Sequence, residues 1–353
     1  MITKPTPKLP QKLRRGWTTG ACATAATKAA LIALWGGGFP DVVSITLPKG
    51  ETPDFDVVNT RAGQGWREAG IIKDAGDDPD VTHGCEVRVR VVARGSDVVF
   101  MAGEGVGIVT KPGLPIAVGE PAINPKPREM MAGVVSEIAA RFGQTADVEI
   151  TISIVNGAAL ALKTWNPRLG IKGGLSVLGT TGVVRPFSCS AWIASIHRGV
   201  DVARATDTLH VAGCTGATSE AAVQAHYDLP DHAMLDMGDF AGGLLKYLRR
   251  HPVARLTIGG GIGKITKLSQ GAVDLHSGRS QVDFATLAKM MDDKRLMNVN
   301  TALEAFEIAG KPMADMVASI ALRTVRDVLR DAEVIVDIII IDRAGNIIAK
   351  ARE

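Results

Sequence analysis

Between residues 208 and 268 the chain repeats one order of elements, in which an apolar strand is followed by glycine and then by a helix. The apolar segments lie at 208–212, 233–237 and 255–258, and Gly213, Gly238 and Gly259 follow them. Strands that are apolar throughout are typical of parallel sheets, whose two faces are covered by helices. The order therefore predicts a Rossmann-like α/β domain with a mostly parallel sheet over residues 201–353. Further helices are expected at 284–291, 301–309 and 313–330, and a terminal hairpin at 333–351.

The preceding part of the chain has a different pattern and predicts an α+β domain over residues 17–200. Strong helix formers fill residues 21–35, between hydroxyl caps at 18–19 and three glycines at 36–38. Alternation of apolar and polar residues predicts strands. After a break at 125–127, apolar residues at helical spacing without proline predict helices. The expected strands are 42–47, 86–93, 98–101 and 148–155, and the expected helices are 130–142 and 190–205. Residues 1–16, rich in proline and cations, are expected to form an N-terminal arm. Two domains are also the default, since 353 residues exceed the roughly 250 to 300 that one core organises.

Composition and charge exclude several classes of function. A formal charge of +3 is too small to indicate nucleic-acid binding, although a small acidic substrate is compatible with it. The four cysteines are scattered without a CxxC pair, which indicates neither a disulfide framework nor a metal site and favours the reducing cytoplasm. No segment reaches the roughly 18 apolar residues of a membrane span. A homo-oligomer is compatible with the sequence.

Glycine turns in the second half are candidates for binding a cofactor. The segment TIGGGIGKITK at 257–267 follows a predicted strand, where a glycine turn lets backbone amides approach a ligand. It is not a Walker A motif, because Gly263-Lys264 is followed by isoleucine. Asp239 follows another strand and could hold ribose hydroxyls, although an ordinary turn or helix cap explains such residues equally well. The candidate cofactor residues are Gly213, Gly216, Asp239, Gly259, Gly260, Gly261 and Gly263.

Cations and an acidic turn in the first half are candidates for substrate binding and catalysis. Cations beside glycine turns and helix amides suit carboxylate or phosphate groups. The acidic segment DAGDDPDVTHG at 74–84 fails the calcium-loop pattern, but Asp77 or His83 could act as a general base if the segment lines a cleft. The alternative is that this segment forms a proline-bearing surface turn without a catalytic role. The candidate substrate-binding residues are Arg14, Arg15, Thr18, Thr19, Gly20, Lys111, Arg128 and Arg168.

Several long motifs occur in order along almost the whole chain. They include LRRGWTTGACATAA at 13–26, DAGDDPDVTHG at 74–84, AINPKPR at 122–128, GTTG at 179–182, GKITKL at 263–268 and DLHS at 274–277. Together they resemble the cobalt-precorrin-5B C(1)-methyltransferase (CbiD) family, and long ordered motifs are far more specific than a lone glycine pattern. The resemblance implies a tetrapyrrole-binding α+β domain followed by a Rossmann-like domain that binds S-adenosyl-L-methionine.

The reaction implied by this resemblance is methyl transfer from S-adenosyl-L-methionine to ring carbon C1 of cobalt-precorrin-5B. The product is cobalt-precorrin-6A of the anaerobic, cobalt-early cobalamin pathway, and the cobalt belongs to the substrate. The candidate cations and the 18–20 turn would then hold carboxylates of the macrocycle. Two alternatives stay open, a non-catalytic tetrapyrrole-binding carrier and a nucleotide-dependent kinase or ligase. The missing Walker residues count against the second.

Overall fold

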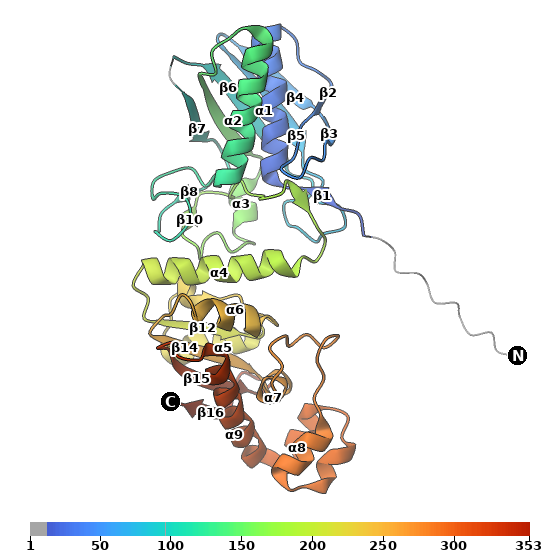
Figure 1. Ribbon diagram of the computed structural model, residues 1–353, viewed down its shortest axis with the longest axis vertical. Coiled ribbons are helices and arrows are strands. Elements are labelled where there is room, and N and C mark those ends of the chain that lie inside the picture. The colour runs from blue at the N-terminus through green and yellow to red at the C-terminus, as the bar shows by residue number, and fades with distance from the viewer. Residues whose placement is uncertain (1–12, 96) are drawn as a thin grey trace, which may run out of the picture. The chain divides into compact units, whose positions relative to one another are not determined.

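The computed structural model describes residues 13–95 and 97–353, and the chain divides into two compact units (Figure 1). The second unit comprises Lys111–Leu114 and Cys189–Glu353, and the first contains the other described residues. Helix α4 (Cys189–Ala205) belongs wholly to the second unit, so the boundary expected at residue 200 falls inside a continuous helix. Residues 1–12 of the expected arm lie outside the described residues, and the end of that segment contributes to strand β1 (Gly16–Trp17).

The first unit is built on a mixed five-stranded sheet. Its strands lie in the order β4 (Val58–Gly63), β5 (Trp66–Ile72), β6 (Glu86–Ala93), β9 (Val148–Ile154) and β7 (Val98–Ala102). All neighbours are antiparallel except β7, which runs parallel to β9. Alternate residues of β6 and β9 are buried, as the alternation of their sequences predicts. The buried side chains of this sheet contribute to the core of the unit.

Helices α1 (Thr19–Gly36) and α2 (Pro125–Phe142) pack against each other beside this sheet (Figure 1). The α1 prediction is confirmed: Thr18 caps the helix by accepting the Ala21 amide, and Gly37 ends it at φ 87°. Helix α2 begins earlier than expected. Proline lacks only an amide that is unpaired in a first helical turn, so Pro125 starts this helix instead of breaking the chain.

Short elements complete the first unit. Three two-stranded ladders join β1 to β11 (Val183–Val184), β2 (Val42–Ser44) to β3 (Asp54–Asp56), and β8 (Ile108–Val109) to β10 (Ile171–Lys172). A short helix, α3 (Gly157–Ala161), follows β9. Two of these ladders connect loops that are distant in the sequence, and the pairing of β1 with β11 places the 13–26 segment beside the 179–186 segment.

The second unit contains another mixed sheet, in the order β13 (Met234–Leu235), β12 (His210–Cys214), β14 (Arg255–Gly261), β15 (Ile335–Ile341) and β16 (Ile347–Arg352). The first four strands are parallel, and β16 pairs antiparallel with β15 as the expected terminal hairpin. The fold is therefore mixed α/β with mixed sheets. Neighbours of β12 are β13 on one side and β14 on the other, so successive connections leave in opposite directions.

Helices and two short 3-10 turns surround this second sheet. The helices are α5 (Ala217–Tyr227), α6 (Ala241–Leu248), α7 (Ile262–Ser269), α8 (Phe284–Met291) and α9 (Ala302–Leu329), and the turns are η1 (Asp231–Ala233) and η2 (Lys294–Asn298). Helix α9 consists of two helical segments, as expected for 301–309 and 313–330, because Gly310 between them has a non-helical φ of 64° and ψ of -153°. No helix within the described ranges is long and apolar enough to cross a membrane.

Candidate functional site

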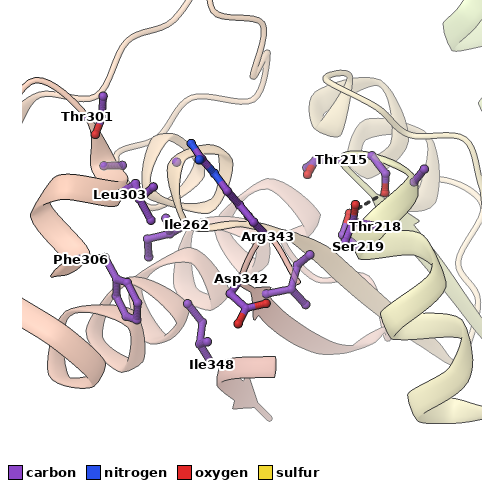
Figure 2. A pocket seen from close by; sticks show the side chains of 16 residues that line it. Thr215, Thr218, Ser219, Ile262, Thr301, Leu303, Phe306, Asp342, Arg343 and Ile348 are labelled. Carbon is purple, nitrogen blue, oxygen red and sulfur yellow. Dashed lines mark hydrogen bonds between the residues drawn. The ribbon is translucent and has the colours of Figure 1, made fainter. Parts of the chain in front are cut away.

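A cavity of about 440 Å³ opens at the carboxyl ends of β12, β14 and β15 (Figure 2). Its walls are the loops 215–219, 261–263 and 341–343, together with the start of α9. Strand order reverses between β12 and β14, and open α/β sheets bind ligands outside the carboxyl ends of strands at such a point. The cavity is therefore where the topology favours a ligand.

One side of this cavity is electropositive. Helices α5 and α7 begin there, and their caps, Gly216 and Gly261, have no side chain to accept the first amides. Unpaired amides and the helix dipole attract anions. Figure 2 shows the Arg343 side chain extending across the cavity, and no carboxylate among the described residues pairs with it. The neighbouring Asp342 carboxylate accepts amides of Ala344 and Asn346 within its own turn. The arrangement suits a carboxylate or phosphate group.

The opposite wall is apolar. Ile262, Leu303, Phe306 and Ile348 line it, from α7, α9 and β16 (Figure 2). Ligand sites commonly combine an aromatic and aliphatic lining with a few polar groups that orient the ligand. This cavity can therefore hold a molecule with an apolar body and an anionic end.

Three of the seven predicted cofactor residues line the cavity, namely Gly216, Gly261 and Gly263. The other glycines lie where helices pack closely on the sheet. A Cβ on Gly213 would lie 2.5 Å from Leu244, and one on Gly259 would lie 2.6 Å from Val223. A Cβ on Gly260 would lie 2.8 Å from the Thr215 hydroxyl oxygen. These three glycines permit close packing and do not border the cavity.

Asp239 also lies outside the cavity lining. Its carboxylate forms an ion pair with Lys264. The Lys264 Nζ donates in addition to the Leu275 carbonyl oxygen at 3.0 Å, and Lys267 donates to the same oxygen at 3.1 Å. Burial and the neighbouring Lys264 ammonium lower the pKa of Lys267. The carboxylate expected to bind ribose therefore holds Lys264, which in turn binds the loop at Leu275.

The amides at the start of α1 are occupied within the first unit. Gly20 donates its amide to the Leu178 carbonyl oxygen at 2.9 Å, and the Thr19 hydroxyl accepts the Leu178 amide at 3.0 Å. Thr18 and Thr19 are 6% and 4% exposed, and Thr18 caps the Ala21 amide. These bonds join α1 to the GTTG loop, which favours a structural role for the 18–20 turn over binding of a carboxylate.

The acidic segment and the first cations hold each other. Arg14 pairs with Asp74, and this guanidinium lowers the pKa of Asp74 to about 2. Asp77 accepts the Arg14 amide at 2.6 Å. His83 accepts the Ala75 amide at its Nδ1, 3.1 Å away, so the neutral ring carries its proton on Nε2 and offers no free lone pair. Each predicted base therefore accepts a backbone amide, and these bonds stabilise the loop.

The buried pair inside this segment predicts a pH dependence. Lys73 is 2% exposed and donates to Asp80 at 2.7 Å. Burial opposes ionisation of Asp80, but Lys73 and Thr82 outweigh it and lower its pKa. Since the folded pKa lies below the unfolded value of about 3.9, this stabilisation is complete above that value and disappears as pH falls through the folded pKa.

We therefore expect Asp80→Asn to lower the free energy of unfolding at neutral pH and to cost progressively less below about pH 4. Urea titrations of the parent and the variant at several pH values measure the difference. A penalty that stays constant down to acid pH would contradict the ionic role of Asp80.

The remaining predicted cations lie on separate segments, and Arg128 belongs to α2. Arg15 pairs with Glu51, and Arg128 pairs with Glu120 while its guanidinium lies 5.4 Å from the Phe100 ring centroid. Arg168 lies over Trp165 at 4.3 Å, and Lys111 belongs to the short segment grouped with the second unit. Within residues 13–95 and 97–353, no three His, Cys, Asp or Glu side chains converge as metal ligands would.

Comparison with known proteins decides the family. The CbiD family model matches residues 6–186, and the model of the CbiD C-terminal domain matches residues 274–352. The chain belongs to the CbiD family. The first CbiD region contains the 18–20 turn and the acidic segment, and the second contains Leu303, Phe306 and Arg343 of the cavity.

Relatives of this CbiD chain match it over nearly their whole length. Proteins named cobalt-precorrin-5B C(1)-methyltransferase share 59% identity in Brucella anthropi and 57% in Paramagnetospirillum magneticum. These alignments cover 99% and 97% of this chain, and 99% of each relative. A crystal structure of the cobalamin biosynthesis protein CbiD from Archaeoglobus fulgidus is similar at 22% identity and a TM-score of 0.41, covering 84% of this chain and 85% of that one.

Sequence reasoning missed the lining residues that come from the last part of the chain. Leu303 and Phe306 come from the start of α9, Ile348 from the final strand, and Arg343 from the hairpin turn. The Thr301 cap and the DRAGN turn at 342–346 are visible in the sequence, but nothing in them indicates proximity to the 261–263 loop. The pairing of β15 with β14 and β16, together with the packing of α9 on α7, brings these segments to one place.

Proposed function

We propose that this chain transfers a methyl group from S-adenosyl-L-methionine to ring carbon C1 of cobalt-precorrin-5B, giving cobalt-precorrin-6A in the cytoplasm. The observation that carries the proposal is identity of 57–59% over nearly the full length of relatives that bear this enzyme's name. A methyltransferase needs a methyl donor, and the cavity of the second unit offers chemistry suited to one.

The second unit is proposed to be Rossmann-like and to hold S-adenosyl-L-methionine. Parallel β13, β12, β14 and β15 and the reversal at β12 support this classification. The starts of α5 and α7, together with Arg343, suit the carboxylate of the methionine part. Phe306 and Ile348 suit the adenine ring.

Positioning is expected to supply much of the rate. When bound, S-adenosyl-L-methionine supplies an electrophilic methyl carbon, which bonds to C1 as its bond to sulfur breaks and the electron pair returns to sulfur. The chain's part is to hold that carbon in line at about 3 to 3.5 Å from C1. Helix amides and Arg343 would fix the anionic end, and the apolar wall would exclude water from the adenosyl group.

Macrocycle binding is proposed for the α+β first unit. Several of its candidate cations already form ion pairs within the protein. Arg14, Arg15 and Arg128 have carboxylate partners, so carboxylates of the substrate would have to compete for them. Asp77 and His83 would have to leave their backbone bonds before either accepted a proton. These observations favour a positional mechanism over one that depends on a general base in this segment.

Incubation with methyl-labelled S-adenosyl-L-methionine and cobalt-precorrin-5B tests the function. We expect the label in the corrinoid product, with no requirement for ATP or nicotinamide. A folded preparation that leaves all label on the donor would disprove the proposal. Tetrapyrrole binding without any S-adenosylhomocysteine binding would instead support a carrier, and preference for ATP with magnesium would support a kinase or ligase.

A further inference from the structure

A second cavity, of about 530 Å³, lies between helices α4 and α6 of the second unit. Its lining is separate from that of the first cavity, and no residue lines both. Three cations contribute to it, Lys246, Arg249 and Arg250, and none of them pairs with a carboxylate in the part of the chain that the structure describes. The final turn of α6 carries Lys246, where the helix dipole also favours positive charge.

Only one carboxylate lines this cavity, and it is already neutralised. Asp274 pairs with Arg279 and accepts the His276 amide at 3.1 Å. The cavity therefore presents cations with no opposing charge of its own. An anionic ligand is the chemistry that such a lining recognises.

An aromatic stack forms another part of the lining. The rings of His197 and Tyr247 are parallel to within 10°, with centroids 3.9 Å apart. The centroid of the His251 ring lies 4.3 Å from that of Tyr247, and these two ring planes are tilted relative to each other. Tyr247 donates its hydroxyl to Asp201 at 2.6 Å, which fixes the ring. Burial and this bond raise the pKa of Tyr247 to about 12. The ligand would therefore meet neutral, oriented aromatic surface beside the cations.

One lysine, Lys264, connects this cavity with the first one. Gly263 lines the first cavity, and the next residue, Lys264, binds Asp239 and the Leu275 carbonyl. Phe240 and Asp274, each adjacent in sequence to one of those partners, line the second cavity. The proposed methyl-donor cavity and the cationic cavity are thus linked through the same lysine.

We propose that the cavity between α4 and α6, rather than the candidate cations of the first unit, binds the carboxylate-bearing edge of the tetrapyrrole substrate. This inference rests on the proposed function, which supplies a flat, carboxylate-fringed ligand. Cavities of about 300 to 1,000 Å³ bury drug-sized ligands, so a hollow of about 530 Å³ takes one edge of a macrocycle and leaves the remainder outside. Lys246, Arg249 and Arg250 bind the carboxylates, and the aromatic stack contacts the ring edge.

Uroporphyrin I, a flat macrocycle fringed with carboxylates, provides a direct probe of the full-length protein. Its binding is followed by porphyrin fluorescence at fixed ionic strength. We expect the double variant Lys246→Gln, Arg250→Gln to bind about tenfold or more weakly, because two charge-assisted contacts are lost.

Arg323→Gln is the matched control, since Arg323 is exposed on α9 and lines neither cavity. Equal weakening by the control and the double variant, or no weakening by either, would overturn the inference. S-adenosylhomocysteine binding and labelled methyl transfer by the parent are measured separately. If the parent neither binds S-adenosylhomocysteine nor transfers the methyl group, the proposed function is wrong. If porphyrin affinity is unchanged in the Lys246→Gln, Arg250→Gln variant, only the proposed macrocycle site is wrong.

Discussion

Replacing Gly261 by valine is expected to weaken S-adenosylhomocysteine binding at least tenfold, about 1.4 kcal/mol, while the fold survives. Gly261 lines the first cavity, and a Cβ built on it meets no atom within 4 Å. Its φ of -70° and ψ of 159° are extended angles that valine adopts readily. The new methyl groups would therefore occupy ligand volume without displacing protein atoms. Calorimetric titration of the folded variant measures the loss.

Two other glycines separate a binding effect from a packing effect. Gly38 is exposed and also has nothing within 4 Å of a built Cβ, so Gly38→Val should change neither affinity nor stability appreciably. Gly260→Ala should destabilise the protein, because its Cβ would lie 2.8 Å from the Thr215 hydroxyl oxygen. Parental affinity in folded Gly261→Val would place the cofactor somewhere other than this cavity.

Asp337→Ala is expected to lower the free energy of unfolding by about 3 to 5 kcal/mol. Asp337 is 2% exposed on the parallel sheet, where it accepts the Arg255 Nε at 2.5 Å and the Tyr227 hydroxyl at 3.3 Å. Thr257, opposite it on β14, lies 3.4 Å away and also contacts His210. Removing the carboxylate leaves a largely buried guanidinium without its counter-ion, and such an uncompensated charge is costly.

Asp315→Ala is the matched control for this experiment. Asp315 pairs with Lys311 on the surface of α9, with side chains 48% and 70% exposed, so its loss should cost less than about 0.5 kcal/mol. Guanidinium denaturation of both variants and the parent gives the comparison. A loss below about 1 kcal/mol for Asp337→Ala would show that solvent replaces the carboxylate at Arg255.

The elements that sequence reasoning predicted well carry their own local signals. Helix α1 has a hydroxyl cap at Thr18 and a left-handed glycine at Gly37, while β6 alternates between buried and partly or fully exposed residues from Val87 to Val92. An error arose where one signal permits two outcomes. Pro125 can break a chain or start a helix, and here it starts α2.

The sequence by itself determined the alternating and capped elements and, through long ordered motifs, the resemblance to the CbiD family, since caps, turns and alternation act over a few residues. Tertiary structure decided which of the adjacent glycines 259–261 border a cavity and which receive a helix. It also paired Arg14 with Asp74 and brought Arg343 beside the 261–263 loop. Such contacts depend on strand order and helix packing, which no local spacing encodes. The same holds for the cations and stacked rings between α4 and α6, because the two helices meet only when the second unit packs.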